Sequence, residues 1–235
     1  MTNPSPDTAP LQAALGHVFL DPSRLADALL HRSAAVEEGR RGWAESQRLE
    51  FLGDAILDFL AADWLMRAMP PDTREGRLTA LRSQLTCTQA LAAVARRISL
   101  ADFITLGVGE ELTGGRNRDA LLADTLEAVF AALWQDAGLP AVQDAFAHLF
   151  APELAAVAAG RNLRDNPKGA LQELVQEHGW PLPSYTLLAA EGPAHAPSFR
   201  VRVAAGPAVA EAVAPTKHDA EQDAARACLR LLAAP

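Results

Sequence analysis

Four acidic residues stand out in this sequence because they lie among apolar residues at helical spacing. Glu50 and Asp54 are four residues apart in the run 48–60, and Asp124 and Glu127 are three apart in the run 120–130. At these spacings the two members of each pair share one face of a helix. Two like charges on a partly buried face destabilise each other unless a cation compensates them. The pattern therefore predicts two helices that each carry a pair of functional carboxylates.

A site for a hard divalent ion is the chemistry that this pattern favours. If the two helices pack face to face, four carboxylate groups converge, and oxygen ligands suit Mg²⁺. The alternative is that these acids are ordinary solvated residues, which is the better interpretation of either pair alone. Both pairs together, each flanked by apolar residues, favour the metal site.

Other residues that could take part in chemistry fit a functional site less well. Asp58 continues the first acidic stripe and is expected at the surface, whereas Glu75 either reaches the site from a loop or caps the following helix. His17 and His31 lack the spacing of zinc-protease or di-iron ligands. The glycines in 107–115 do not form a dinucleotide-binding fingerprint, and the sequence has no Walker-type phosphate loop. A di-metal redox bundle is therefore disfavoured.

The acidic residues must be positioned by helices, because the first two-thirds of the chain has a helical pattern. Apolar residues recur at three- and four-residue spacing in five segments, at 24–36, 48–69, 78–97, 119–136 and 140–158. This pattern predicts an all-α domain over 11–158. The polar residues of 159–165 then predict a linker.

The remaining segment, 166–234, predicts a small α-β-β-β-α domain. Asn166 and Pro167 suit the start of a helix that extends to about His178. Thr216 and Asp219 resemble a capping box at the start of a closing helix. Between the helices, three alternating runs separated by Gly and Pro predict an antiparallel meander, with strands at Ser184–Ala190, Ser198–Ala205 and Ala208–Val213.

Composition limits the function classes. The chain has 235 residues, of which 49% are apolar and 21% charged, as in globular proteins. It shows neither a membrane-spanning run nor a signal peptide, and Cys87 and Cys228 lie far apart, so we expect a cytoplasmic protein without a disulfide framework. The net charge of −8 provides no bulk attraction for nucleic acid, so RNA binding would depend on local contacts and metal ions.

The run Gln47–Leu57 closely resembles the signature motif of bacterial ribonuclease III. Further matches are His31-Arg32-Ser33, the segment 74–79 and the second acidic motif in 122–128. The C-terminal α-β-β-β-α segment looks like a double-stranded-RNA-binding domain, so the resemblance covers Leu11 to Leu232.

The resemblance implies a hydrolase that cuts both strands of double-stranded RNA, leaving 5′-phosphate and 3′-hydroxyl ends with short 3′ overhangs. It implies processing of structured precursors of ribosomal RNA and messenger RNA, and Mg²⁺, or Mn²⁺ in its place, as the cofactor. A homodimer is implied too, with Phe51 at the interface, although an ordinary core aromatic is the alternative there. The implied metal ligands are those that the spacing selects, Glu50, Asp54, Asp124 and Glu127, of which Asp54 and Glu127 are the implied catalytic residues.

Two departures from the family pattern affect these expectations. Gln47 stands where the family commonly has an acidic residue, while Glu75 retains the other outer acidic position. We therefore expect activity with an altered metal dependence or cleavage preference. The second departure is a shortage of lysines on the implied RNA-binding surface, which consists of Gln172, Glu173, Gln176, His195 and Lys217.

We expect this domain to bind RNA weakly by itself, with a shallow dependence on salt, because few cations are available to contact phosphates. Lys168, near the start of the first helix, adds one amine. A non-catalytic RNA-binding scaffold is the alternative function. It is disfavoured because such a protein has no use for the four buried acids.

Overall fold

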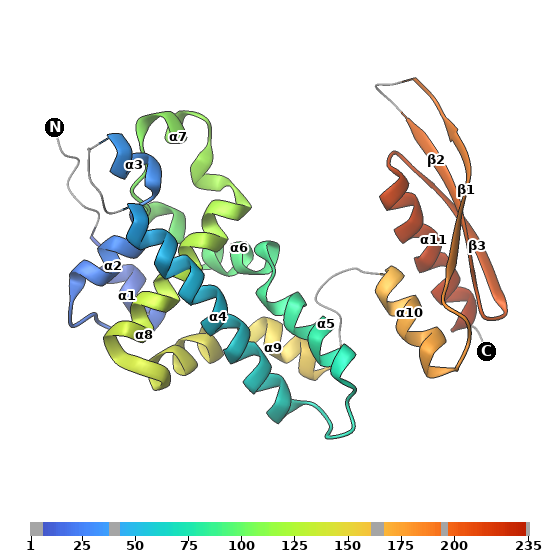
Figure 1. The fold of residues 1–235 in the computed structure, drawn as a ribbon, viewed down its shortest axis with the longest axis horizontal. Coiled ribbons are helices and arrows are strands. Elements are labelled where there is room, and N and C mark those ends of the chain that lie inside the picture. The colour runs from blue at the N-terminus through green and yellow to red at the C-terminus, as the bar shows by residue number, and fades with distance from the viewer. Residues whose placement is uncertain (1–6, 38–42, 161–166, 194–196, 234–235) are drawn as a thin grey trace. The chain divides into compact units, whose positions relative to one another are not determined.

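A computed structural model describes residues 7–37, 43–160, 167–193 and 197–233 (Figure 1). The chain divides into two compact units, 1–163 and 164–235. The predicted architecture, an all-α domain followed by a small α-β-β-β-α domain, is confirmed. The predicted His195 lies outside the described residues.

The first unit is a bundle of helices with two short 3₁₀ turns, η1 and η2. Its elements are α1 (Ala9–Leu15), α2 (Pro22–Ala28), α3 (Arg32–Glu37), α4 (Trp43–Ala68), α5 (Glu75–Thr86), α6 (Thr88–Arg97), η1 (Leu100–Phe103), α7 (Val108–Leu112), η2 (Gly115–Asn117), α8 (Asp119–Leu149) and α9 (Ala151–Ala158).

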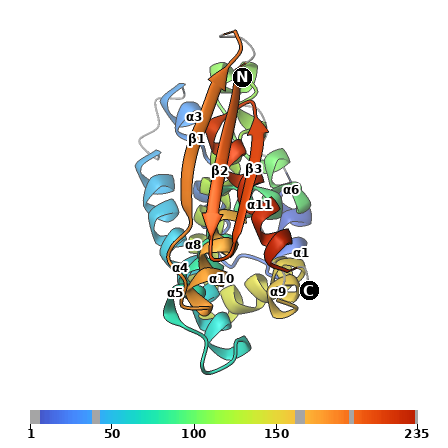
Figure 2. The same ribbon diagram turned by 90° about the vertical axis from the view of Figure 1, so that its right-hand side faces the viewer.

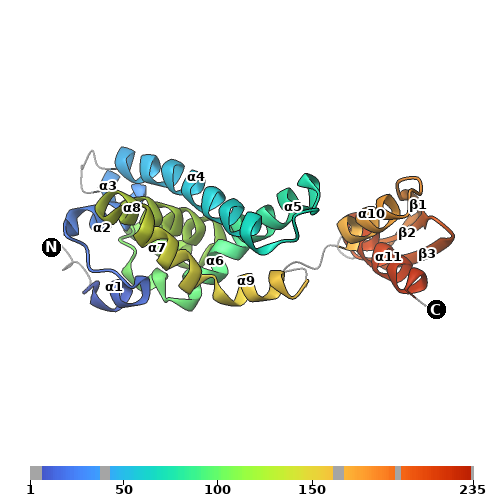
Figure 3. The same cartoon turned by 90° about the horizontal axis from the view of Figure 1, so that it is seen from below.

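Helices α4 and α8 form the centre of this unit and lie side by side (Figures 1 and 3). Their contact is apolar: Leu57 and Leu60 of α4 and Leu126 and Phe130 of α8 are all buried in the same core. Burying a large apolar side chain contributes about 1.5–3 kcal/mol relative to leaving it exposed. The two helices that carry the predicted acidic pairs are therefore held against each other by the core.

Several predicted helical segments are interrupted. The segment 24–36 is divided between α2 and α3, because Leu30 leaves the helix to form an isolated parallel bridge with Thr105. The segment 78–97 is divided at Cys87, whose backbone is extended (φ −72°, ψ 155°). The segment 140–158 is divided at Phe150, between α8 and α9. Apolar periodicity continues across these breaks, so the sequence pattern did not reveal them.

The second unit is a three-stranded antiparallel sheet with two helices on one face (Figures 1 and 2). The strand order is β1-β2-β3, and the helices bury Leu171 and Val175 of α10 and Ala224 of α11 against the sheet. Strand positions agree with the prediction to within one residue at each end. The elements are α10 (Pro167–Glu177), β1 (Ser184–Glu191), β2 (Ser198–Ala205), β3 (Ala208–Ala214) and α11 (Lys217–Leu232).

The predicted cap of the last helix is confirmed. The backbone N–H of Asp219 donates to Oγ1 of Thr216 at 3.1 Å, which satisfies one of the free donors of the first turn. Among the described residues, no helix combines the length and apolar character that crossing a membrane requires.

Candidate active site

The close approach of α4 and α8 depends on Gly53. A Cβ atom built at this position would overlap the backbone carbonyl of Glu127, so any larger residue would push the two helices apart. A glycine within a helix costs roughly 0.5–1 kcal/mol relative to alanine, and here the close contact compensates for it. The absence of a side chain at residue 53 therefore brings the acidic face of α4 onto that of α8.

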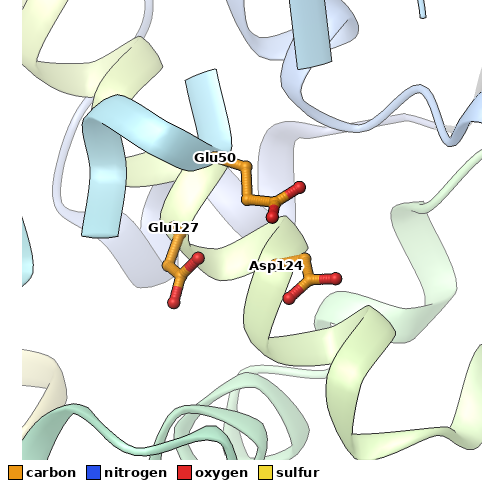
Figure 4. Close-up of side chains that lie close together, drawn as sticks. All are labelled: Glu50, Asp124 and Glu127. Atoms are coloured by element: carbon orange, nitrogen blue, oxygen red, sulfur yellow. The ribbon is translucent and has the colours of Figure 1, made fainter. Parts of the chain in front are cut away.

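Three carboxylates meet where the helices cross. Glu50 extends from α4 toward Asp124 and Glu127 of α8 (Figure 4). One oxygen of each of these three residues lies within 4.8 Å of the other two. This separation suits ligands that share one cation, and the arrangement agrees with the pairing of acidic faces expected from the sequence.

Among the described residues, no cation is paired with this cluster. In the ranges that the structure describes, none of the hydrogen bonds or ion pairs involves the carboxylates of Glu50, Asp124 or Glu127. Burial raises the pKa of Glu50 and of Asp124 above their ordinary values, and for Glu50 the neighbouring carboxylates raise it further. An external cation would relieve both effects.

Glu127 is the most strongly perturbed member of the cluster. Burial, followed by the charges of Asp54, Asp124, Glu50 and Asp58, raises its pKa from 4.5 to about 8. Without a cation, its carboxyl therefore holds a proton at neutral pH. A carboxyl with so high a pKa beside other carboxylates is typical of a functional site.

Asp54 is placed differently from the other three predicted ligands. It is outside the group that lies within 4.8 Å, and its side chain is exposed, as that of Asp124 is. It remains close enough for its charge to be the largest electrostatic contribution to the raised pKa of Glu127. The structure thus brings three of the four predicted ligands together and leaves the fourth at the rim.

The other acidic positions have partners of their own. Asp58 accepts a hydrogen bond from the hydroxyl of Thr86 at 2.7 Å and lies 3.6 Å from Arg82, so it connects α4 to α5. Glu75 is exposed in the first turn of α5 and accepts a hydrogen bond from the Thr79 hydroxyl at 3.0 Å. Asp58 therefore interacts across two helices, whereas Glu75 interacts within α5.

A cavity of about 330 Å³ adjoins the carboxylates and has cations in its wall. It is lined by Glu50 and Asp124, by the exposed Gln47, and by Arg32 and Arg118 among others. Gln47 therefore lies where an additional carboxylate would face the same space.

Part of this wall was missed by sequence reasoning. His31 also lines the cavity, and its ring is held by the hydroxyl of Ser33 at 2.7 Å. Burial lowers the pKa of His31, and the charges of Arg32 and Arg118 lower it further, so the ring is neutral at pH 7. Arg118 is paired with Glu110 from α7. The match of His31-Arg32-Ser33 to the family pattern already indicated one part of this wall, and the charged residues around the glycines of 107–118 could have indicated the other.

Phe51 lies on the surface of α4. Its side chain is 80% exposed, so the alternative of an ordinary core aromatic is wrong for the single chain. An exposed phenylalanine of this kind indicates a contact surface when it belongs to a larger apolar patch. Ala55 and the half-exposed Phe59 follow it at four-residue spacing on the same face of α4.

Apart from His195, which lies outside the described residues, the predicted RNA-binding residues lie on the two helices of the second unit. Gln172 and Gln176 are exposed on α10, and Glu173 beside them is partly buried. Lys217 is the first residue of α11 and is exposed.

Comparisons with known proteins agree with this geometry. Residues 21–154 match a family model described as Ribonuclease-III-like, and residues 167–232 match the double-stranded RNA binding motif. The chain is 44% identical over 217 residues to Ribonuclease 3 of Dinoroseobacter shibae, covering 92% of this chain and 91% of that protein. It is 39% identical to Ribonuclease 3 of Pseudothermotoga lettingae, covering 93% and 92% of the two chains.

A solved structure resembles the first unit. The nuclease domain of ribonuclease III from Campylobacter jejuni is 31% identical, with a TM-score of 0.58, and the match covers 63% of this chain and 98% of that one. That structure is described as showing flexibility in a region involved in dimer formation.

Proposed function

This chain belongs to the ribonuclease III family, and from that premise we propose that it cuts double-stranded RNA with the help of Mg²⁺ held by its acidic cluster. The products would carry 5′-phosphate and 3′-hydroxyl ends. The segments 11–158 and 166–234 would serve as its nuclease and RNA-binding domains, a division that the two matched family models support.

The observation that carries the proposal is the meeting of Glu50, Asp124 and Glu127, with which no cation of the described residues is paired. Their ligand atoms are all oxygens, which Mg²⁺ and Mn²⁺ both accept, so the residues present fit the proposed ion. Asp54 at the rim is the fourth oxygen donor. A non-catalytic scaffold would gain nothing from keeping this destabilising group of acids.

The residues of the chain divide the proposed work between them. Glu50, Asp124 and Glu127 would hold the ion, and Glu127 would release its proton as the ion binds, because the carboxylate is the ligand form. When bound, Mg²⁺ supplies positive charge at the scissile phosphate and lowers the pKa of water for the attack. Asp54 would serve both as a ligand of the ion and as a catalytic residue. It lies at the rim of the cluster, where RNA and solvent can reach it. Gln47 would orient RNA or solvent by hydrogen bonds without adding charge.

We also propose that the active form is a homodimer. The exposed Phe51 on α4 supports this assignment, as does the description of the Campylobacter jejuni relative. Two copies would place one acidic cluster at each strand of a duplex, which accounts for short 3′ overhangs. Structured precursors of ribosomal RNA and messenger RNA in the cytoplasm are the proposed substrates.

Incubating the purified protein with a long end-labelled duplex tests the proposal directly. With Mg²⁺ we expect endonucleolytic fragments with 5′-phosphate ends and 3′ overhangs, and with a chelator we expect intact duplex. Single-stranded RNA of the same sequence is the matched substrate control. Cleavage without a divalent ion, or no cleavage of duplex with Mg²⁺ or Mn²⁺, would contradict the proposed mechanism.

A further inference from the structure

In the second unit, one carboxylate forms ion pairs with amines from two helices. Nζ of Lys168 in α10 lies 2.6 Å from Oε2 of Glu221 in α11. Nζ of Lys217, one turn earlier in α11, lies 3.9 Å from Oε1 of the same residue. The Glu221 side chain is only 16% exposed, whereas that of Lys217 is 60% exposed. Glu221 thus lies sheltered between the two amines.

Lys168 is held by more than this ion pair. Its ammonium group lies 4.7 Å from the centre of the Tyr185 ring in β1, which is within cation–π range. Its backbone N–H donates to Oε1 of Gln222 at 3.2 Å. The amine is therefore fixed between a carboxylate and an aromatic face, and it can bind a phosphate only by leaving both.

The ion pairs of Glu221 with Lys168 and Lys217 lie on the surface proposed to contact RNA. Lys168, Gln172 and Gln176 follow one another at four-residue spacing and so share a face of α10. Lys217 begins α11, the other helix of this surface. Glu221 joins the two helices at the point where their amines could meet a phosphate backbone.

We propose that Glu221 is an internal counter-ion that weakens duplex binding by competing with RNA phosphates for Lys168 and Lys217. The inference depends on the proposed RNA-binding function of this unit. Ion pairs that water can reach contribute little free energy, so phosphates are able to displace the carboxylate. Breaking each ion pair nevertheless costs free energy, which reduces the net binding free energy of the phosphate contact. An amine that is already paired also releases fewer counter-ions from the RNA when it binds.

Binding of the full-length chain to a labelled duplex of about 20 base pairs, without divalent ions so that no cleavage occurs, tests the proposal. For Glu221→Gln we expect about two- to fivefold tighter binding at low salt. The plot of log affinity against log salt should become steeper by up to about one unit for each amine released.

Asp223→Asn is the matched control. It removes the same charge from the same helix, but Asp223 is paired with Arg226 and neither lysine contacts it. If Glu221 acts locally, Asp223→Asn should change the affinity less than Glu221→Gln does. Adding Lys168→Gln to the Glu221→Gln variant should remove most of the gain.

Lys168→Gln is informative in the Glu221→Gln variant, where the amine no longer faces that carboxylate. It should lower the affinity there by about twofold or more, and no loss there would overturn the inference. Unchanged or weaker binding by a folded Glu221→Gln variant, judged by thermal melting, would overturn it too, since Glu221 would then be inert or would position the lysines. If the wild-type chain binds no duplex at all, the proposed RNA-binding function itself fails.

Discussion

The two proposed functional surfaces treat charge in opposite ways. In the first unit, Glu50, Asp124 and Glu127 lie together without a cation among the described residues. In the second, charged side chains pair with one another, as Lys168 does with Glu221 and Arg202 with Glu211. The proposed metal site is therefore incomplete until an external cation arrives, whereas on the proposed RNA-binding surface Lys168 and Lys217 must leave Glu221 to bind a phosphate.

The largest expected effect comes from changing the uncompensated cluster. Glu127→Gln should lower cleavage by about a hundredfold or more, because the neutral amide cannot hold the ion with the same charge. Duplex binding, measured without divalent ions, should remain nearly unchanged, since the contacts of the second unit are intact. Cleavage rates and a binding titration on the same preparation check both parts.

Asp63→Asn is the control for this variant. It also removes one carboxylate, but from the part of α4 where Asp63 pairs with Arg67. It should cleave at the wild-type rate. Cleavage by Glu127→Gln at the wild-type rate would show that Glu127 is not part of the active site. The contrast between the two surfaces would then no longer hold.

The first unit also leaves apolar surface uncovered, and a second copy is the partner proposed for it. Phe51→Ala should weaken the dimer by about 2 kcal/mol, or roughly thirtyfold in dissociation constant, if Phe51 is a central contact. Sedimentation across a range of concentrations measures this change. Leu112→Ala, at a position that is 82% exposed on α7, removes a similar apolar side chain and should leave the dimer intact. A dimer insensitive to Phe51→Ala would contradict the proposed interface.

Stability against pH sharpens the comparison, because the first unit contains a carboxyl, that of Glu127, whose pKa is strongly raised. The pKa of Glu127 is about 8 in the fold and 4.5 ordinarily, so between these values the folded chain holds a proton that the unfolded chain has released. The metal-free protein should therefore lose stability as the pH rises from about 5 to about 8. The expected loss is on the order of 1–2 kcal/mol, after allowing for solvent screening.

Denaturant unfolding in the presence of a chelator measures this effect. Glu127→Gln isolates it, since titration of His31 and other groups is common to both proteins. The difference in unfolding free energy between variant and wild type should grow with pH, and Mg²⁺ should reduce it by stabilising the ionised wild-type cluster. A difference that stays constant from pH 5 to pH 8 would show that the Glu127 pKa is not raised.

The smallest effect is expected at the edge of the cluster. Gln47→Glu adds a carboxylate to the cavity that Glu50 and Asp124 line. The added charge should lower the half-saturating Mg²⁺ concentration by up to about fivefold, with little change in the maximal rate. Gln135→Glu, about two turns beyond Glu127 on α8, adds the same charge away from the cavity and should have no such effect. Identical metal titrations of both variants would count against a role for residue 47.

Local periodicity explains what could be predicted from the sequence. Strand positions follow from alternation within runs of seven or eight residues, and the Thr216 cap follows from a four-residue pattern. The acidic faces of α4 and α8 follow from spacing within one helix each. These features depend on neighbours in sequence, which the sequence displays directly.

Features that depend on contacts between distant segments could not be predicted in this way. The break at Leu30 requires Thr105, and the exposure of Asp54 depends on how α4 is rotated against α8. The ion pairs of Glu221 require α10 to pack against α11. Sequence spacing places these residues on elements but does not set the angle or distance between elements.

Gly53 gives the acidic cluster a dependence on packing that its ligands alone would not have. Because the backbones of α4 and α8 meet there, even one methyl group at this position would separate Glu50 from Glu127 while altering neither of them. Selection for RNA cleavage therefore constrains a residue that has no functional group of its own. The range of amino acids tolerated at this position is set by the reaction as much as by the core.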